Sequence, residues 1–157
     1  KRNLPRLERF LTTLPSAHRY AFEFRNAEWF DDEAYCLLAK HDCAFCIYDL
    51  NGRLSPKVLT ADFVYVRLHG PGGPYQGRYD DGTLSGWAKN FTGWAAEGKK
   101  VYCYFDNDQS GYAALNALRL QDMIRGKRTS NVPGPDEGLM TTQRGAKIGG
   151  RIPSAKA

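Results

Sequence analysis

Strand-like and helix-like segments alternate along residues 1–125, and this alternation limits the fold more than any other feature of the chain. Amphipathic helices are predicted at residues 3–14, 32–40, 83–97 and 112–124, where apolar residues recur at helical spacing. Strands are predicted at residues 18–25, 43–50, 63–69 and 99–106. Strict alternation predicts a parallel sheet joined by right-handed crossovers, which is an α/β fold.

The two faces of each predicted strand differ, and this favours a barrel over an open sheet. Strand 63–69 places Tyr65, Arg67 and His69 on one face and only aliphatic residues on the other. Helices cover both faces of an open doubly wound sheet, so both faces should be apolar. The inner face of a barrel carries polar side chains near its mouth. We therefore predict a TIM-type (β/α) barrel, of which this chain supplies about four βα units.

Net charge and composition divide the chain into a domain at residues 1–125 and a tail at residues 126–157. The formal charge is +5, and the tail holds six Lys or Arg residues against two acidic ones. The predicted domain is nearly neutral, so the charge is weak evidence for a nucleic-acid-binding face. The tail lacks periodicity and is rich in Gly, Pro and Ser, so we expect it to be a disordered basic segment.

The lack of a long apolar run and the pattern of the cysteines predict a cytoplasmic protein. No run approaches the roughly 20 residues that span a bilayer, and the first residues lack the apolar block of a signal peptide. Cys43 and Cys46 have the C-x-x-C spacing of redox or zinc pairs, but residues three apart on a strand point to opposite faces. We expect these two cysteines, with Cys36 and Cys103, to be buried and reduced.

Ionisable residues gather where the predicted strands end. The four carboxyl ends carry Glu23, Arg25, Asp49, Arg67, His69 and Asp106 to Asp108. Active sites of (β/α) barrels lie at this end of the strands. The alternative is a cluster in which the acidic and basic groups only neutralise one another. Because all four strands deliver polar groups to one rim, we favour a functional pocket.

Several motifs resemble the YecE-like family, catalogued as domain of unknown function 72. They are EFRNAEW (23–29), YVRLHG (65–70), the spaced Tyr75 and Tyr79, and VYCYFDNDQSGYAALNALRL (101–120). The resemblance covers residues 1–125 and implies a TIM-type barrel, of which this chain matches the carboxyl-terminal half only. The family's motif residues fall on Glu23, Arg25, Trp29, Asp49, Arg67, His69, Gly70, Tyr75, Tyr79, Trp87, Tyr104, Phe105, Asn107, Asp108 and Asn116. Asn26 and Asp106 depart from the commonest family residues, His and Asn. The resemblance names no reaction.

Three kinds of chemistry fit these residues. The glycine-rich loop at residues 70–77, with Arg67 and Arg78, has the composition of a phosphate cradle. A divalent metal is a second hypothesis, with Glu23, Asp106 and Asp108 as the first candidate ligands and Asp49 and His69 beside them. The third is metal-free acid–base catalysis by His69, oriented by Glu23 or Asp49, with Arg67 stabilising negative charge.

The sequence therefore predicts a hydrolase-like enzyme acting on a phosphorylated, nucleotide or sugar substrate. The predicted catalytic residues are His69, Arg67, Glu23 and Asp49, and the predicted substrate-binding residues are Arg25, Tyr75, Tyr79, Asn107 and Asp108. The alternative is a non-catalytic module that binds a nucleotide or single-stranded nucleic acid, with added affinity from the basic tail. Open edges of a half-barrel also predict self-association.

Overall fold

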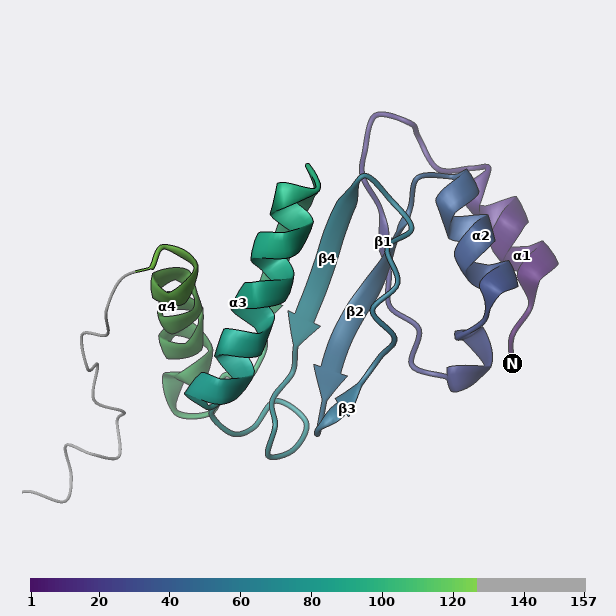
Figure 1. Ribbon diagram of the computed structural model, residues 1–157. Helices are drawn as coiled ribbons and strands as arrows, with labels where there is room; N and C mark the ends of the chain where they lie inside the picture. Colours follow the sequence, from purple (N-terminus) through teal and green to yellow (C-terminus); the bar gives the residue numbers. More distant parts are fainter. Residues whose placement is uncertain (127–157) are drawn as a thin grey trace, which may run out of the picture.

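The computed structural model describes residues 1–126, which form a parallel sheet with flanking helices (Figure 1). The tail predicted to be disordered lies outside the described residues. The elements in chain order are α1 (Leu4–Leu11), β1 (Ala21–Phe22), η1 (Ala27–Trp29), α2 (Asp32–Lys40), β2 (Ala44–Leu50), β3 (Arg53–Leu54), β4 (Phe63–Leu68), α3 (Asp81–Ala96), β5 (Lys100–Phe105), η2 (Gln109–Gly111) and α4 (Tyr112–Ile124). The predicted alternation is confirmed.

The sheet has the order β1-β2-β4-β5, and all three of these pairings are parallel. Its register places Cys46 of β2 beside Tyr65 of β4, and Arg67 of β4 beside Tyr104 of β5. The inner-face side chains of neighbouring strands therefore stand side by side. Because the strands are parallel, their carboxyl ends meet at one edge, where the ionisable residues lie.

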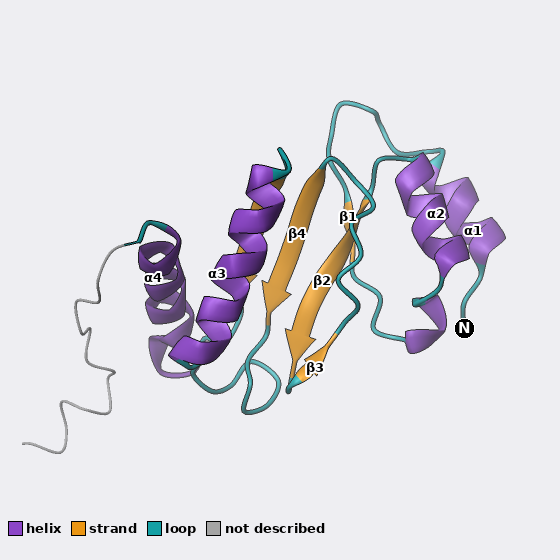
Figure 2. Cartoon of the chain, in the orientation of Figure 1, coloured by secondary structure: helices purple, strands orange, loops and turns teal. Residues whose placement is uncertain are grey.

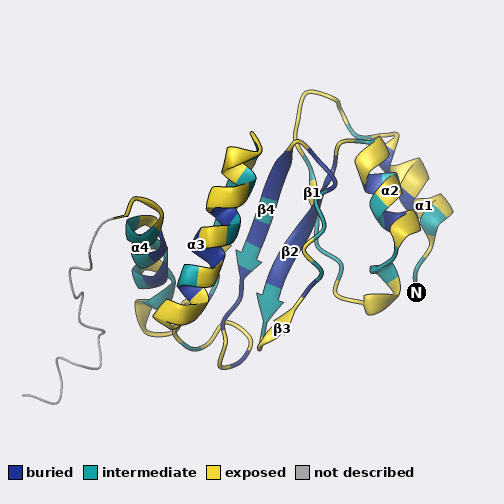
Figure 3. Cartoon of the chain, viewed as in Figure 1, coloured by how far each residue is buried: buried dark blue, intermediate teal, exposed yellow. Residues whose placement is uncertain are grey.

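The two faces of the sheet differ as the sequence predicts. Val64, Val66 and Leu68 of β4 are buried in a core with residues of all four helices, and β2 and β4 are buried along most of their length (Figure 3). On the opposite face Tyr65 packs on a small separate cluster, and Tyr104 remains 48% exposed. This asymmetric parallel sheet is compatible with part of a TIM-like barrel.

Two predicted elements are shorter in the structure by four residues or more, and the others agree within two residues at each end. The strand predicted at 18–25 is paired only over Ala21–Phe22, because β1 is the edge of the described sheet and has one neighbour. The helix predicted at 3–14 ends at Leu11. Pro15 disfavours helical backbone in the residue before it, and the Thr12 and Thr13 hydroxyls donate back to carbonyls of the last helical turn.

The segment predicted as a loop at residues 51–61 begins with a short hairpin instead. β3 pairs antiparallel with β2, and Figure 2 shows it beside the carboxyl end of that strand. The turn is Asn51-Gly52, and both residues have positive φ (55° and 69°). Asn-Gly is the preferred sequence for a two-residue turn of this kind, so the signal was present in the sequence.

The cysteines follow the prediction with one exception. All four are free; Cys43 and Cys46 are buried and Cys103 is partly buried. Cys36 is exposed on α2, so its predicted burial is wrong: it does not belong to the row of Ala34 and Leu38 that faces the core. Within residues 1–126, no helix is long and apolar enough to cross a membrane.

Candidate functional site

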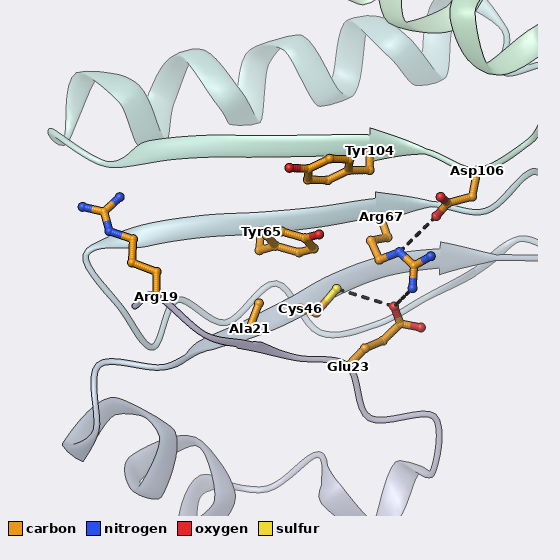
Figure 4. Close-up of a pocket in the computed structure, with 8 residues that line it drawn as sticks. All are labelled: Arg19, Ala21, Glu23, Cys46, Tyr65, Arg67, Tyr104 and Asp106. Atoms are coloured by element: carbon orange, nitrogen blue, oxygen red, sulfur yellow. Dashed lines mark hydrogen bonds and ion pairs between the residues drawn. The ribbon is translucent and has the colours of Figure 1, made fainter. Parts of the chain in front are cut away.

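A pocket of about 440 Å³ lies on the inner face of the sheet (Figure 4). It is lined by Arg19, Ala21, Glu23, Cys46, Tyr65, Arg67, Tyr104 and Asp106. The rings of Tyr65 and Tyr104 stack with centroids 5.1 Å apart and planes 29° from parallel. The pocket thus has an aromatic wall in the middle of the sheet and an ionic group at the carboxyl end of the strands.

Arg67 is the centre of the ionic group. Its Nη1 donates to Oε2 of Glu23 at 3.0 Å, and its Nε donates to Oδ2 of Asp106 at 3.1 Å. The carboxylates follow β1 and β5, so the central strand β4 places Arg67 between them, as Figure 4 shows. Arg25 also pairs with Glu23. The Glu23 and Asp106 side chains are only 14% and 23% exposed, so the guanidinium groups compensate carboxylates that are largely removed from water.

His69 lies behind this ion pair and is fully buried. Its Nδ1 is 3.2 Å from Oδ2 of Asp106, and its Nε2 is 3.4 Å from Oε1 of Glu23. Arg25 also approaches Nε2, at 3.2 Å. Burial of the ring lowers the pKa of His69 below its usual value, and this effect outweighs the carboxylates, which act in the opposite direction. The imidazole is therefore neutral at pH 7 and the ionic group as a whole is balanced.

Tyr75 covers the His69 ring from the glycine-rich loop. The two rings meet edge to face with centroids 5.5 Å apart. Tyr75 has φ of 65°, which is the left-handed region that non-glycine residues rarely adopt, and its side chain remains half exposed. The backbone of the loop thus presents this ring both to His69 and to solvent.

Asp49 lies apart from the ionic group. Its carboxylate hydrogen-bonds the Tyr79 hydroxyl, and burial raises the pKa of Asp49. It lines a separate hollow of about 230 Å³ together with Lys57 and Trp87. Its contact with His69 is between backbones, from the His69 N–H to the Asp49 carbonyl at 2.8 Å. Of the two carboxylates predicted to orient the imidazole, Glu23 contacts it, and the Asp49 carboxylate lies outside the ionic group.

Three glycine N–H groups of the loop at residues 70–77 already have acceptors within the protein. Gly70 N–H donates to the Tyr79 hydroxyl at 2.9 Å, Gly72 N–H to the carbonyl of Gln76 at 3.2 Å, and Gly77 N–H to Oε1 of Gln109 at 3.1 Å. A Cβ on Gly70 would lie 2.2 Å from the Gln76 carbonyl oxygen. Close backbone packing therefore explains these glycines, and the phosphate cradle expected from the sequence gains no support from them.

Tyr79 and Asn107, predicted to bind substrate, are buried in a network that fixes this loop. Tyr79 N–H donates to Oδ1 of Asn116 at 3.1 Å, and Nδ2 of Asn116 donates to the Tyr79 carbonyl at 3.0 Å. Nδ2 of Asn107 donates to the Gly77 carbonyl and to Oδ1 of Asn116. Asp108 is exposed just before η2. These residues hold the rim together, and the structure places none of them on the wall of the pocket.

The metal hypothesis gains no support from the described residues. Within residues 1–126, no three His, Cys, Asp or Glu side chains are placed to hold a metal ion. Glu23 and Asp106 face the guanidinium of Arg67, which occupies the position between them that a cation would take.

Sequence reasoning missed Cys46 and Arg19 as pocket residues, and it assigned neither Tyr65 nor Tyr104 a catalytic or substrate-binding role. The Sγ of Cys46 is 3.7 Å from Oε2 of Glu23, and burial raises the pKa of its thiol, so the thiol stays protonated and donates. Strand alternation would have found Cys46, because it shares the inner face with Tyr48. Alternation in the strand predicted at 18–25 would likewise have found Arg19, because it shares a face with Glu23.

Comparison with known proteins places the sequence in a recognised group. The family model described as "Protein of unknown function DUF72" matches residues 1–138. A solved DUF72 family protein from Thermotoga maritima is 28% identical, with a TM-score of 0.69 over 78% of this chain and 51% of its own. A DUF72 family protein from Enterococcus faecalis is similar in fold at 19% identity, with a TM-score of 0.63 over 80% of this chain and 53% of its own. The chain thus spans about half the length of these solved relatives. A search among curated proteins finds no match.

Proposed function

The chain belongs to the DUF72 family, and on that premise we propose that it carries one side of a hydrolase-like active site for a small sugar or nucleotide. The observation that carries the proposal is Arg67, held between Glu23 and Asp106 at the carboxyl end of the strands and beside a pocket with a tyrosine wall. The reaction proposed is cleavage of a glycosidic or phosphoester bond.

The two carboxylates fit acid–base chemistry because they flank a single guanidinium and both line the pocket. Hydrolysis of a glycosidic bond uses one carboxyl group to protonate the leaving oxygen and a second to activate water or to stabilise charge. Glu23 and Asp106 would share these roles, and the cluster would orient them before substrate binds.

Arg67 has donors left for a substrate oxygen. A guanidinium carries five N–H groups, and the bonds to Glu23 and Asp106 use two of them, the Nε–H and one N–H of Nη1. Nη2 makes no hydrogen bond to another described residue, and the side chain is 34% exposed. It would bind a hydroxyl or phosphoryl oxygen and stabilise negative charge that develops there.

His69 would act as a positioning residue. Its ring is fully buried, neutral at pH 7, and in contact with both carboxylates, so it would fix their orientation without touching the bond that is cleaved. Arg25 has a 42% exposed side chain, contacts the His69 ring that Tyr75 covers, and would bind the substrate at the rim.

The charge balance and the aromatic wall narrow the substrate class. Two arginines and two carboxylates leave no excess of positive charge, which disfavours a polyphosphate. The stacked rings of Tyr65 and Tyr104 offer a flat surface to a sugar or a base. A monosaccharide unit or a nucleoside with one phosphate fits best.

A binding module without catalysis is the second candidate. It is favoured by Tyr102 and Tyr104, which are 39% and 48% exposed on the inner face of β5 and present the kind of aromatic row on which bases stack. Binding that weakens steeply with salt and is never followed by turnover would distinguish this candidate from the enzyme.

The test is turnover of 4-nitrophenyl glycosides and of bis(4-nitrophenyl) phosphate by the full chain, compared with Glu23→Gln. Glu33→Gln is the matched control, because Glu33 also pairs with an arginine but is 74% exposed on α2. We expect at least a 100-fold loss of kcat for Glu23→Gln and no change for Glu33→Gln. Equal rates for the two variants, or no turnover by the wild-type chain either alone or mixed with the half of the Thermotoga maritima protein that this chain leaves unmatched, would refute the enzyme.

A further inference from the structure

The ring of Tyr75 closes the rim of the site above His69. It meets the imidazole edge to face, with the ring centroids 5.5 Å apart, and His69 is fully buried. The Tyr75 side chain itself nevertheless remains half exposed. Tyr75 therefore shields a buried group without being part of the core.

The backbone at Tyr75 is held in a conformation that a tyrosine does not favour. Its φ of 65° lies in the left-handed region. The loop is fixed at both ends, by the bond from the Gly70 N–H to the Tyr79 hydroxyl and by the bond from Asn107 to the Gly77 carbonyl. Strain of this kind persists where the surrounding structure imposes it, and it concentrates at ligand sites. Burial of a half-exposed ring does not explain why the strain is kept.

Three flat groups lie together at this part of the rim. The phenol ring of Tyr48 meets the His69 imidazole with centroids 6.3 Å apart, and the Arg25 guanidinium lies 5.1 Å from the centre of the Tyr48 ring. Nη2 of Arg25 also donates to Nε2 of His69 at 3.2 Å, because a guanidinium is a donor only. Imidazole, phenol and guanidinium groups all interact favourably with a further planar ring.

We propose that the Tyr75 ring occupies a subsite for the base of a nucleotide, and that the base displaces the ring when the nucleotide binds. Exposed side chains change rotamer within nanoseconds, so the ring leaves by rotating into water while the anchored loop stays in place. The base then covers His69 in its turn and contacts the exposed guanidinium of Arg25.

The subsite adjoins the groups that would bind the rest of the substrate. Arg25 and Arg67 both pair with Glu23, so a base beside Arg25 brings its ribose and phosphate toward Nη2 of Arg67. The stacked rings of Tyr65 and Tyr104 are then left to the sugar. A nucleotide is favoured over a saccharide, because a planar base matches these flat groups more closely than a puckered, hydroxylated sugar ring does.

Displacement of Tyr75 rests on the proposed function only in that a ligand binds at the rim; it does not depend on which bond is cleaved. Binding and the exposure of His69 test it without turnover. Failure of the displacement is therefore distinguishable from failure of the proposed reaction.

The test is calorimetric titration of the full 157-residue chain with adenosine 5′-monophosphate (AMP), and with ribose 5-phosphate as the ligand that lacks a base. Tyr75→Asn removes the ring, and asparagine tolerates the left-handed backbone of this position. Tyr75→Phe is the matched control, because it keeps the ring and loses only the hydroxyl.

We expect Tyr75→Asn to bind AMP about fivefold more tightly than the wild type, or better, because apparent affinity falls by the fraction of molecules in which a subsite is open. Tyr75→Phe should bind AMP as the wild type does. The affinity for ribose 5-phosphate should be the same in all three chains.

The exposure of His69 gives a second readout. Diethyl pyrocarbonate acylates neutral imidazoles, and His69 is neutral at pH 7, so burial rather than charge limits its reaction. Acylation of His69 should be about fivefold faster in Tyr75→Asn than in the wild type and Tyr75→Phe, with the exposed His18 unchanged. AMP should slow the reaction of His69 in Tyr75→Asn.

Weaker binding of AMP to Tyr75→Asn would overturn the proposal, because the ring would then contact the ligand instead of yielding to it. Equal binding, no binding, an equal gain for ribose 5-phosphate, or unchanged acylation of His69 would overturn it as well. Circular dichroism checks that the variants fold. If Tyr75→Asn is unstable, Tyr75→Gly, which also suits a φ of 65°, should give the same gain.

Discussion

Replacing Arg67 by methionine tests the ionic group directly, because methionine keeps most of the apolar stem and removes only the guanidinium. Arg67 makes two charge-assisted hydrogen bonds, to Glu23 and Asp106, at 3.0 and 3.1 Å. Bonds of this kind contribute about 1.5–3 kcal/mol each. One third of the Arg67 side chain is exposed, so water replaces part of what is lost. We therefore expect the free energy of unfolding to fall by about 2 kcal/mol, close to a 30-fold change in the folding equilibrium.

Urea unfolding followed by circular dichroism at pH 7.5 measures this change, and Arg119→Met is the matched control. Arg119 also makes two hydrogen bonds to carboxylate oxygens, but both go to the exposed Asp81 on α3. The fall in the free energy of unfolding for Arg119→Met should be less than half that for Arg67→Met. Adding Asp106→Asn to Arg67→Met should recover stability, because the carboxylate that Arg67→Met leaves without a guanidinium disappears, whereas Glu23 keeps its pair with Arg25. Equal losses of unfolding free energy for the two arginine variants, or additive effects of Arg67→Met and Asp106→Asn, would contradict these contacts.

The stability loss caused by Arg67→Met should depend on pH, because Arg67 affects the pKa of His69. The folded-state pKa of His69 is lowered, so its contribution to stability is present above the unfolded value of 6.5 and declines as the pH falls below it. The positive charge of Arg67 adds to this lowering. Without that charge the pKa of His69 rises, and the protonated ring compensates Glu23 and Asp106. The stability gap between wild type and Arg67→Met should therefore narrow from pH 7.5 to pH 5.5; a widening gap would contradict the proposed contacts.

Three further predictions follow from the loop and the thiols. Gly70→Ala should destabilise by about 2–4 kcal/mol, because its φ is 116° and the new Cβ would clash with backbone, whereas Gly86→Ala in α3 meets open space and should stabilise by about 0.5–1 kcal/mol; urea unfolding measures both. Tyr79→Phe should cost about 1–2 kcal/mol in the same assay, because it leaves the Gly70 N–H without its acceptor. Iodoacetamide at pH 8 should label the exposed Cys36 well before Cys46, whose burial raises its pKa, and mass spectrometry of the native protein gives the order.

Period-two alternation made the sheet predictable. In residues 63–69 the pattern separates Val64 and Val66 from Tyr65 and Arg67, and the structure places the first pair in the core and the second on the inner face. The strand predicted at 18–25 shortened to two residues because pairing depends on neighbours, which a single segment does not encode. The Asn51-Gly52 hairpin was readable from its turn sequence alone.

The candidate site was predictable in position but not in its internal contacts. The carboxyl ends of parallel strands must meet, so Glu23, Arg67 and His69 were expected together. The sequence also indicated that Asp49 would lie apart from Glu23 and Arg67. Asp49 shares a strand face with Ile47, which packs toward the helices. The burial of Tyr79 was not predictable, because its backbone hydrogen-bonds the side chain of Asn116, 37 positions further along the chain. Long-range polar pairing of this kind has no local signature.

A cluster built only for stability differs from a binding site in how it uses its donors. The buried side-chain amides of Asn107 and Asn116 hydrogen-bond backbone groups and one another. They fix a loop whose residues do not line the pocket. Arg67 is arranged differently, because two of its nitrogens are bound to carboxylates while Nη2 has no partner among the described residues and the side chain stays one third exposed. The guanidinium is thereby fixed in direction and still able to bind. The face onto which it opens also carries the stacked rings of Tyr65 and Tyr104, so a substrate held by Arg67 would lie against this aromatic wall.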